Sequence, residues 1–236
     1  MNLQRLLLAL LLPWVWACNS LPGRPDPADR YIIPTKVTDF NTLYEMNCSG
    51  CHGADGRFGP ALPIGDVVYL ALAKPDYIES IARTGVPGTT MPAFAIENGG
   101  TLTDEQITII AKGLNTRWGD GGRLVAGAKL PPLSVKEAKM TGAASRGANT
   151  FKTFCAECHG PLGRGTAKAG SVVEPPYLAL VSNQNLRSIT IIGRRDLGMP
   201  DWREVGDRAM TNQEIADVVA WLVAQRPKPP SQRKAN

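Results

Sequence analysis

Two copies of one short cysteine–histidine motif constrain this 236-residue chain more than any other feature. The chain contains five cysteines and two histidines, and all but one of these residues fall into two pentads of the form C-x-x-C-H. The first pentad spans residues 48–52 and the second spans residues 155–159. Their cysteines and histidines are Cys48, Cys51, His52, Cys155, Cys158 and His159.

The pentad C-x-x-C-H is the attachment sequence of c-type haem. Two cysteines three positions apart on a helical turn reach the two vinyl groups of one porphyrin, and the adjacent histidine then points at the iron. Each pentad therefore predicts one covalently bound haem c, with His52 and His159 as iron ligands.

Three other uses of paired cysteines are weaker explanations. A zinc site would need its two C-x-x-C pairs much closer in sequence than they are here. A thioredoxin-like dithiol needs a βαβ context, which the sequence does not offer. Structural disulfides are allowed in an exported chain, but they would not place a histidine after each pair. Haem attachment is therefore favoured.

The pentads belong to a longer repeat. The numbers of His52 and His159 differ by 107, and the tetrad Tyr-Leu-Ala-Leu at 69–72 recurs at 177–180, an offset of 108. Further pairs at this repeat offset of 108 are Met91-Pro92 with Met199-Pro200, Phe94 with Trp202, Thr103 with Thr211, and Leu114 with Leu222. Such register over a whole unit indicates an internal duplication and hence two equivalent domains.

Both units show helical periodicity, and neither shows the alternation of a strand. The apolar residues at helical spacing before the first pentad are Val37, Phe40, Leu43 and Tyr44. A middle helix follows 75–76, and the last helices open with the capping boxes Thr103-x-x-Gln106 and Thr211-x-x-Glu214. We therefore predict an all-α fold.

One methionine per unit has the spacing of a sixth iron ligand. The spacing from the pentad histidine is 39 for Met91 and 40 for Met199, and each methionine lies in a loop rich in glycine and proline. A methionine is more often core filler than a ligand, but the duplicated spacing favours His/Met-ligated iron here. Three methionines without a repeat partner are expected to pack in the core or at the surface: Met46, Met140 and Met210.

These motifs resemble those of class I di-haem cytochromes c, in which two mono-haem modules are fused, over about residues 37–226. The resemblance implies an electron-transfer protein rather than an enzyme, with two covalently bound haem c groups. It also implies that a proline carbonyl after the pentad orients the histidine. Pro60 matches that proline, and the second unit offers only Pro176.

The small number of histidines excludes several other haem and metal proteins. Because both histidines are assigned to the pentads, none remains for a bis-histidine haem, a histidine copper site or a catalytic histidine. Di-haem peroxidases resemble this chain in having two such pentads, but they use an additional histidine as a detachable ligand. That class is therefore disfavoured.

The N-terminus predicts export. Residues 1–17 have the features of a signal peptide, with an apolar stretch too short to span a bilayer. The arrangement before Cys18 resembles a bacterial lipoprotein signal, in which cleavage leaves an acylated cysteine. Trp16 departs from the small residue usual there, so a simple cleaved signal and an uncleaved anchor remain alternatives. A lipoprotein would lie on the periplasmic side of the cytoplasmic membrane, anchored through Cys18.

The proline-rich, polar stretch that follows suits an extended tether. The predicted organisation is a signal peptide at 1–17, a lipid-anchored tether at 18–36, a first cytochrome c domain at 37–120, a linker at 121–140, a second domain at 141–226 and a basic tail at 227–236.

The net charge of +5 is dispersed, which disfavours a nucleic-acid partner. Residues 36–120 carry a net charge of −4, whereas residues 121–226 carry +5. This difference is either ordinary solvated surface or a sign that the two modules face differently charged redox partners. Three arginines near the methionine loops are candidates to pair with haem propionates: Arg83, Arg194 and Arg195.

Two functional classes remain. The first is a membrane-tethered carrier that moves single electrons between respiratory or photosynthetic proteins. The second is a fixed electron-transfer subunit of a larger membrane complex, such as a quinol-oxidising complex, a terminal oxidase or a periplasmic dehydrogenase. The same haem chemistry serves both.

Overall fold

A computed structural model describes Gly23, Asp26 and residues 31–227. The predicted signal peptide, Cys18, most of the predicted tether and nearly all of the basic tail lie outside the described residues. The chain divides into two compact units, residues 1–37 and 38–236. In the first unit the described residues form one short 3-10 helix, η2 (Pro34–Lys36), with proline in its first turn. Among the described residues, no helix has the length and apolar character needed to cross a membrane.

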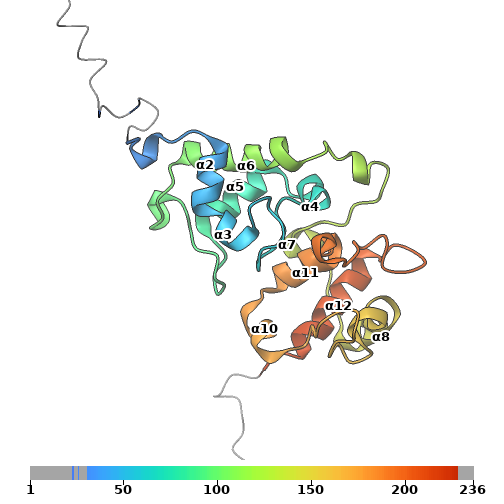
Figure 1. The fold of residues 1–236 in the computed structure, drawn as a ribbon. Coiled ribbons are helices and arrows are strands. Elements are labelled where there is room, and N and C mark those ends of the chain that lie inside the picture. Colours follow the sequence, from blue (N-terminus) through green and yellow to red (C-terminus); the bar gives the residue numbers. More distant parts are fainter. Residues whose placement is uncertain (1–22, 24–25, 27–30, 228–236) are drawn as a thin grey trace, which may run out of the picture. The chain divides into compact units, whose positions relative to one another are not determined.

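The second unit consists of helices joined by loops (Figure 1). Its first half runs through α2 (Phe40–Asn47), α3 (Ser49–His52), α4 (Val67–Leu72), α5 (Pro75–Thr84), η3 (Ile96–Asn98) and α6 (Asp104–Trp118). Its second half repeats the order with α8 (Ala144–Phe154), α9 (Ala156–His159), α10 (Pro175–Leu180), α11 (Asn183–Ile192), η5 (Arg195–Leu197) and α12 (Asn212–Ala224). The element order thus repeats as the sequence repeat predicts.

The helix ends follow from local sequence. The side chains of Thr103 and Thr211 each accept a hydrogen bond from the backbone amide three residues later. In return, the side chains of Gln106 and Glu214 accept one from the backbone amides of Thr103 and Thr211. Both predicted capping boxes are therefore confirmed. The first helix differs from its prediction, because Asp39 caps α2 and the helix begins at the next residue. Val37, predicted as part of that helix, therefore lies outside it.

In each half the helix before the pentad packs against the last helix, α2 on α6 and α8 on α12. Each crossing places a glycine against a bulky side chain, on opposite partners in the two halves. Gly113 of α6 faces the ring of Phe40, whereas Gly147 of α8 lies against the backbone of Asp217 and the side chain of Trp221. The exchange preserves a close approach of the two helices in both halves.

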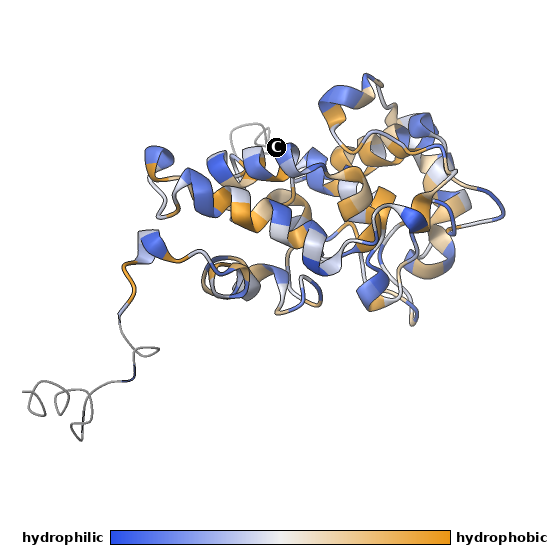
Figure 2. Ribbon diagram, turned by 90° about the horizontal axis from the view of Figure 1, so that it is seen from above, coloured by the Kyte–Doolittle hydropathy of each residue, from blue (hydrophilic) through white to orange (hydrophobic). Residues whose placement is uncertain are grey.

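The last helix of each half carries more buried apolar residues than any other helix of that half. Buried residues on these two helices include Ile107, Ile110, Leu114, Ile215, Val218 and Leu222, which are the apolar stripes expected from the sequence. Hydrophilic and hydrophobic stretches alternate along the longer helices (Figure 2). Among the described residues there are no strands, only two isolated bridges, Ala95 with Leu102 and Arg194 with Met199.

The predicted linker has structure of its own. It contains η4 (Arg123–Val125) and α7 (Val135–Ala138). The Gln184 side chain of α11 donates to the Leu133 carbonyl and accepts from the Val135 amide. Arg187, also on α11, donates twice to the Pro132 carbonyl. The segment before α8 is therefore bound to the second half of the unit.

Candidate haem sites

The first pentad lies on a tight helical turn directly after α2. Cys48 caps α3, and its carbonyl accepts hydrogen bonds from the amides of Cys51 at 3.2 Å and His52 at 3.0 Å. This geometry places Cys51 and His52 one turn after Cys48, which is the local arrangement that attachment to a single porphyrin requires.

The second pentad has the same backbone geometry. Cys155 caps α9, and its carbonyl accepts from the amides of Cys158 at 3.3 Å and His159 at 3.0 Å. Each histidine is followed by a glycine with positive φ, Gly53 at 84° and Gly160 at 75°, which ends the turn. The two pentads are therefore equivalent in conformation as well as in sequence.

The pentad cysteines form no disulfides with one another, so their thiols remain available for thioether bonds. All four cysteines of the pentads are free thiols. Burial, together with the neighbouring Cys51, raises the pKa of Cys48 to about 12. Burial and Cys158 raise the pKa of Cys155 to about 12 as well. Both thiols stay protonated at neutral pH, unlike the low-pKa thiols of redox-active pairs.

The histidines are held in the form that binds iron. The Nδ1 atom of His52 lies 2.7 Å from the Leu62 carbonyl, and that of His159 lies 2.8 Å from the Gly170 carbonyl. A carbonyl can only accept, so each Nδ1 carries a proton, and in the neutral imidazole this tautomer leaves the lone pair on Nε2 for a metal. Burial lowers the pKa of His52, which keeps that imidazole neutral.

The carbonyl partners differ from those expected. The resemblance implied a proline carbonyl at the histidine, from Pro60 in the first half, but the structure places the Leu62 carbonyl there. In the second half Gly170 takes this position, and Pro176 instead lies in the first turn of α10. The sequence carries no signal for either carbonyl, because any residue can supply one.

The methionine loops follow α5 and α11 and have matching backbone contacts. The Met91 carbonyl accepts from the Val86 amide at 3.1 Å, and the Met199 carbonyl accepts from the Arg194 amide at 3.1 Å. Both methionines are partly buried. The donor set of each half is thus two thiols, one imidazole and one thioether, the group types that hold a covalently bound haem.

A glycine before each methionine loop was missed in the sequence. Gly85 and Gly193, which are related by the repeat offset, have φ of 66° and 71°. A Cβ atom at either would overlap the backbone of the Met-Pro pair that follows. The repeat itself was the signal, since the same glycine recurs at the same offset.

The three arginines predicted to pair with propionates already have carboxylate partners. Arg83 pairs with Glu97 and Asp104. Arg194 pairs with Asp196, and Arg195 pairs with Asp201. In this structure all three side chains therefore form ion pairs within the protein.

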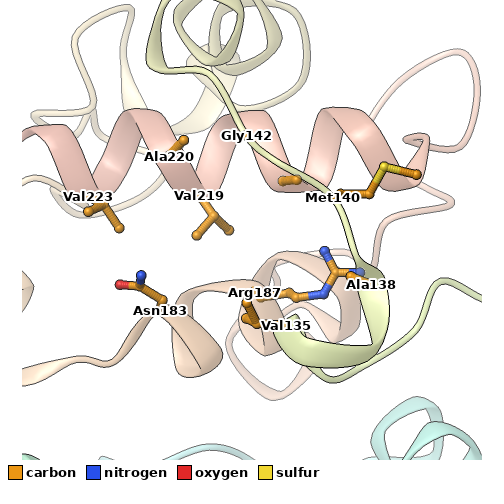
Figure 3. Close-up of a pocket in the computed structure, with 10 residues that line it drawn as sticks. Val135, Ala138, Met140, Gly142, Asn183, Arg187, Val219, Ala220 and Val223 are labelled. Atoms are coloured by element: carbon orange, nitrogen blue, oxygen red, sulfur yellow. The ribbon is translucent and has the colours of Figure 1, made fainter.

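A cavity of about 280 Å³ lies elsewhere, between α7, α11 and α12 (Figure 3). Its lining residues are Val135, Ala138, Met140, Gly142, Asn183, Arg187, Ala216, Val219, Ala220 and Val223. None of the predicted haem-site residues contributes to it. Within the described ranges, no three or more His, Cys, Asp or Glu side chains gather as a metal site.

The family described as "Cytochrome C oxidase, cbb3-type, subunit III" matches residues 35–112 and 142–222, which together make up more than half of the chain. The chain belongs to this family. Each matched segment contains one pentad and one Met-Pro pair. The predicted all-α fold with two tandem cytochrome c domains is therefore confirmed, and so are two covalently bound haem c groups.

Two curated relatives of this cytochrome c are named as subunits of oxidoreductases. It is 24% identical over 212 residues to the "Cbb3-type cytochrome c oxidase subunit CcoP" of Azospirillum sp. (strain B510), a match that covers 82% of this chain and 58% of that protein. It is 36% identical over 121 residues to the "Fructose dehydrogenase cytochrome subunit" of Gluconobacter japonicus, covering 42% of this chain and 24% of that one. The chain spans less than two thirds of the length of either relative.

Among solved structures, a chain of the reducing HAO-like protein complex of Kuenenia stuttgartiensis is similar to this cytochrome c. The match covers 84% of this chain and 100% of that chain, with 18% sequence identity and a TM-score of 0.43.

Proposed function

We propose that this cytochrome c carries single electrons through two His/Met-ligated haems, one in each half of its helical unit. The observation that supports this most is the duplicated donor set, in which each half combines a pentad, a carbonyl-bonded imidazole and a methionine loop. Cys48 and Cys51 would hold the first haem, with His52 and Met91 on its iron. The equivalent residues of the second site are Cys155, Cys158, His159 and Met199.

Bound haem supplies an iron that accepts one electron and releases it again. With both haems bound, the chain would take one electron per iron from its donor, hold at most two and pass them on singly. The residues of this chain set the conditions for that exchange. The thioethers formed by the cysteines would fix the porphyrin, the histidine imidazole would donate its lone pair, and the methionine thioether would favour a higher reduction potential.

We place the protein on the periplasmic side of the bacterial cytoplasmic membrane, anchored by lipid at Cys18. Covalent haem attachment at such pentads requires export, as the family resemblance implies, and residues 1–17 have the features of an export signal. Two or more acyl chains hold a protein firmly at a membrane, whereas one chain does so only marginally.

The redox partners would be membrane oxidoreductases. Both curated relatives are named as subunits, which supports the alternative of a fixed subunit in a larger complex. The opposite net charges of residues 36–120 and 121–226 support two different partner surfaces, as a carrier between donor and acceptor would need. Gentle solubilisation of native membranes separates the two alternatives, since a carrier migrates alone and a subunit migrates with larger chains.

The test of the haem sites is a mass measurement on denatured protein. The exported chain should retain two haem masses, and the variants Cys48→Ser/Cys51→Ser and Cys155→Ser/Cys158→Ser should each retain one. A Met46→Ala variant serves as the control and should retain both, because Met46 is 70% exposed and has no place in either donor set. An unsubstituted chain that retains one haem or none would refute the proposal.

A further inference from the structure

One ion pair in the second half contacts the loop that follows the first pentad. The carboxylate of Asp196, 1% exposed, accepts from Arg194 at both of its oxygens, at 2.9 Å and 2.8 Å. The same carboxylate accepts from the Phe58 amide at 2.9 Å, and Arg194 donates to the Gly59 carbonyl at 3.1 Å. The pair thus binds the backbone of two adjacent residues that are far away in sequence.

The loop that these bonds hold is strained. Phe58 has a φ of 62° and a side chain that is 72% exposed, so a bulky residue adopts a left-handed conformation without burial of its ring. When the two halves are aligned on their pentad histidines, the equivalent residue is Gly165, which has a φ of 93°. A glycine adopts that conformation without strain, so only the first half needs an outside contact to maintain it.

The duplicated unit also shows what the contact replaces. In the second half the Gly165 amide donates to the His159 carbonyl of its own pentad, at 2.8 Å. In the first half the corresponding amide, that of Phe58, donates instead to Asp196. The Phe58 amide of the first half therefore uses an acceptor from the second half, whereas the Gly165 amide of the second half uses its own pentad.

The held loop lies directly on the first pentad. A Cβ atom at Gly59 would overlap the backbone of Cys51 and His52, so these backbones are in close contact. Farther along the loop, the Ala61 amide donates to the Cys51 carbonyl at 3.0 Å, and the Leu62 carbonyl accepts from His52. A displacement of the loop would therefore reach the imidazole.

The other end of the contact lies on the second methionine loop. The backbones of Arg194 and Met199 exchange two hydrogen bonds, at 3.1 Å and 3.0 Å, which form one of the two isolated bridges. At the repeat offset, Val86 and Gly88 of the first half replace Arg194 and Asp196. The acid–base pair is thus specific to the second half.

We propose that Arg194 and Asp196 are positioning residues that couple the two haem sites, holding the loop over His52 against the loop of Met199. The inference rests on the haem ligands assigned under the proposed function. Loss of the pair would loosen the Leu62 carbonyl at His52, weaken the donation of its imidazole and raise the reduction potential of the first haem.

The test uses the double variant Arg194→Met/Asp196→Ala in the haem-loaded protein, which keeps the net charge and removes every donor and acceptor of the pair. Amide hydrogen exchange at Phe58 should become about tenfold faster or more, because a hydrogen bond to a buried carboxylate is lost. Potentiometric titration should show a rise in the reduction potential of the first haem. This haem is identified as the one whose potential changes in a Met91→Ala variant. Addition of Phe58→Gly to the double variant should reduce the effect, since glycine needs no outside contact there.

The matched control is Arg208→Gln/Glu214→Gln, which removes a charge-neutral ion pair of the same half that contacts none of these residues. It should leave Phe58 exchange and the first potential unchanged. An unchanged Phe58 exchange rate in the Arg194/Asp196 variant would overturn the positioning role, and an unchanged first potential would overturn the coupling. The haem content of the unsubstituted chain is measured first. Missing haem would count against the proposed function, whereas the exchange rate of the Phe58 amide would still show whether Arg194 and Asp196 hold the loop.

Discussion

At the scale of single residues, the two halves place the same chemical groups in the same local geometry. The pentad turns, the carbonyl bonds to the imidazoles and the methionine loops all recur. Burial, which lowers the pKa of His52, favours the neutral ligand form in the first half. The predicted iron ligands can therefore be tested one at a time, with each half as a reference for the other.

Replacement of either Met91 or Met199 by alanine should convert one haem from low-spin to high-spin, because the iron loses its sixth ligand. The optical and electron paramagnetic resonance spectra of the other haem should stay unchanged. Met46→Ala is the control and should leave both haems low-spin, since its side chain is 70% exposed. A stable high-spin haem in the unsubstituted protein would argue against methionine ligation. It would also reopen the interpretation as a haem enzyme, such as a di-haem peroxidase.

A second prediction at this scale concerns the capping residue of α12. The hydrogen bonds from Arg208 and Thr211 lower the pKa of Glu214 to about 2, against an ordinary value of 4.5. Because the pKa of Glu214 is lower in the folded than in the unfolded chain, its charge stabilises the folded state at pH values above about 4.5. This contribution is lost as the pH falls from about 4.5 toward 2. Glu214→Gln should thus lower the free energy of unfolding by about 1 kcal/mol at pH 7, after allowance for solvent screening.

The difference between parent and variant should shrink as the pH falls below about 4.5 and approach zero below about pH 2, where Glu214 is protonated in the folded as well as the unfolded state. Urea unfolding of both proteins at several pH values measures this. Glutamine keeps the capping box, as Gln106 does at the equivalent position of α6, so the variant tests the charge rather than the cap. A difference that persists unchanged at low pH would mean that the charge contributes nothing.

At the scale of helices, the crossing between the first and last helix of each half is the most constrained contact. A Cβ atom at Gly147 would meet backbone of α12, whereas one at Gly113 would meet the side chain of Phe40, which moves more easily than backbone does. We expect Gly147→Ala to cost about 2–3 kcal/mol and Gly113→Ala about 1 kcal/mol in the free energy of unfolding.

Gly50→Ala is the reference for this pair, because a Cβ atom there meets nothing within 4 Å. It should change the free energy of unfolding by less than about 1 kcal/mol. Thermal or denaturant unfolding of the three variants gives the ranking. A Gly147→Ala protein as stable as the Gly50→Ala protein would show that the helices can separate without cost.

Sequence patterns predicted the helices and ligand candidates because both depend on neighbours a few positions apart. The capping boxes, the pentad turns and the recurrence of Met-Pro are all local or follow from the repeat. The predicted start of α2 at Val37 was wrong, because the apolar spacing extends to residues before the Asp39 cap, whereas the helix begins after it. The hydrogen bond from the Phe58 amide to Asp196 was not predictable. Any residue could supply such a backbone amide, and the two residues are 138 positions apart in sequence.

At the scale of the whole protein, the predicted lipid anchor would decide where the two haems act. Cys18 lies outside the described residues, so the prediction rests on the sequence before and after it. An extended chain covers about 3.3 Å per residue, so the predicted tether at 18–36 would keep the haem domains within some tens of ångströms of the membrane. Such confinement raises the local concentration of the cytochrome at membrane partners without any new contact.

Cys18→Ser should therefore release a soluble protein that keeps both haem spectra and delivers electrons more slowly to membrane-bound partners. Fractionation of cells into membrane and soluble parts, followed by a haem stain, measures the release, and oxygen consumption by washed membranes measures the delivery. Addition of the released protein in excess should restore the rate if the protein is a carrier, because only its local concentration was lost. If the Cys18→Ser protein stays on the membrane after a salt wash, protein contacts or an uncleaved anchor hold it there, and the role of a fixed subunit becomes the better account.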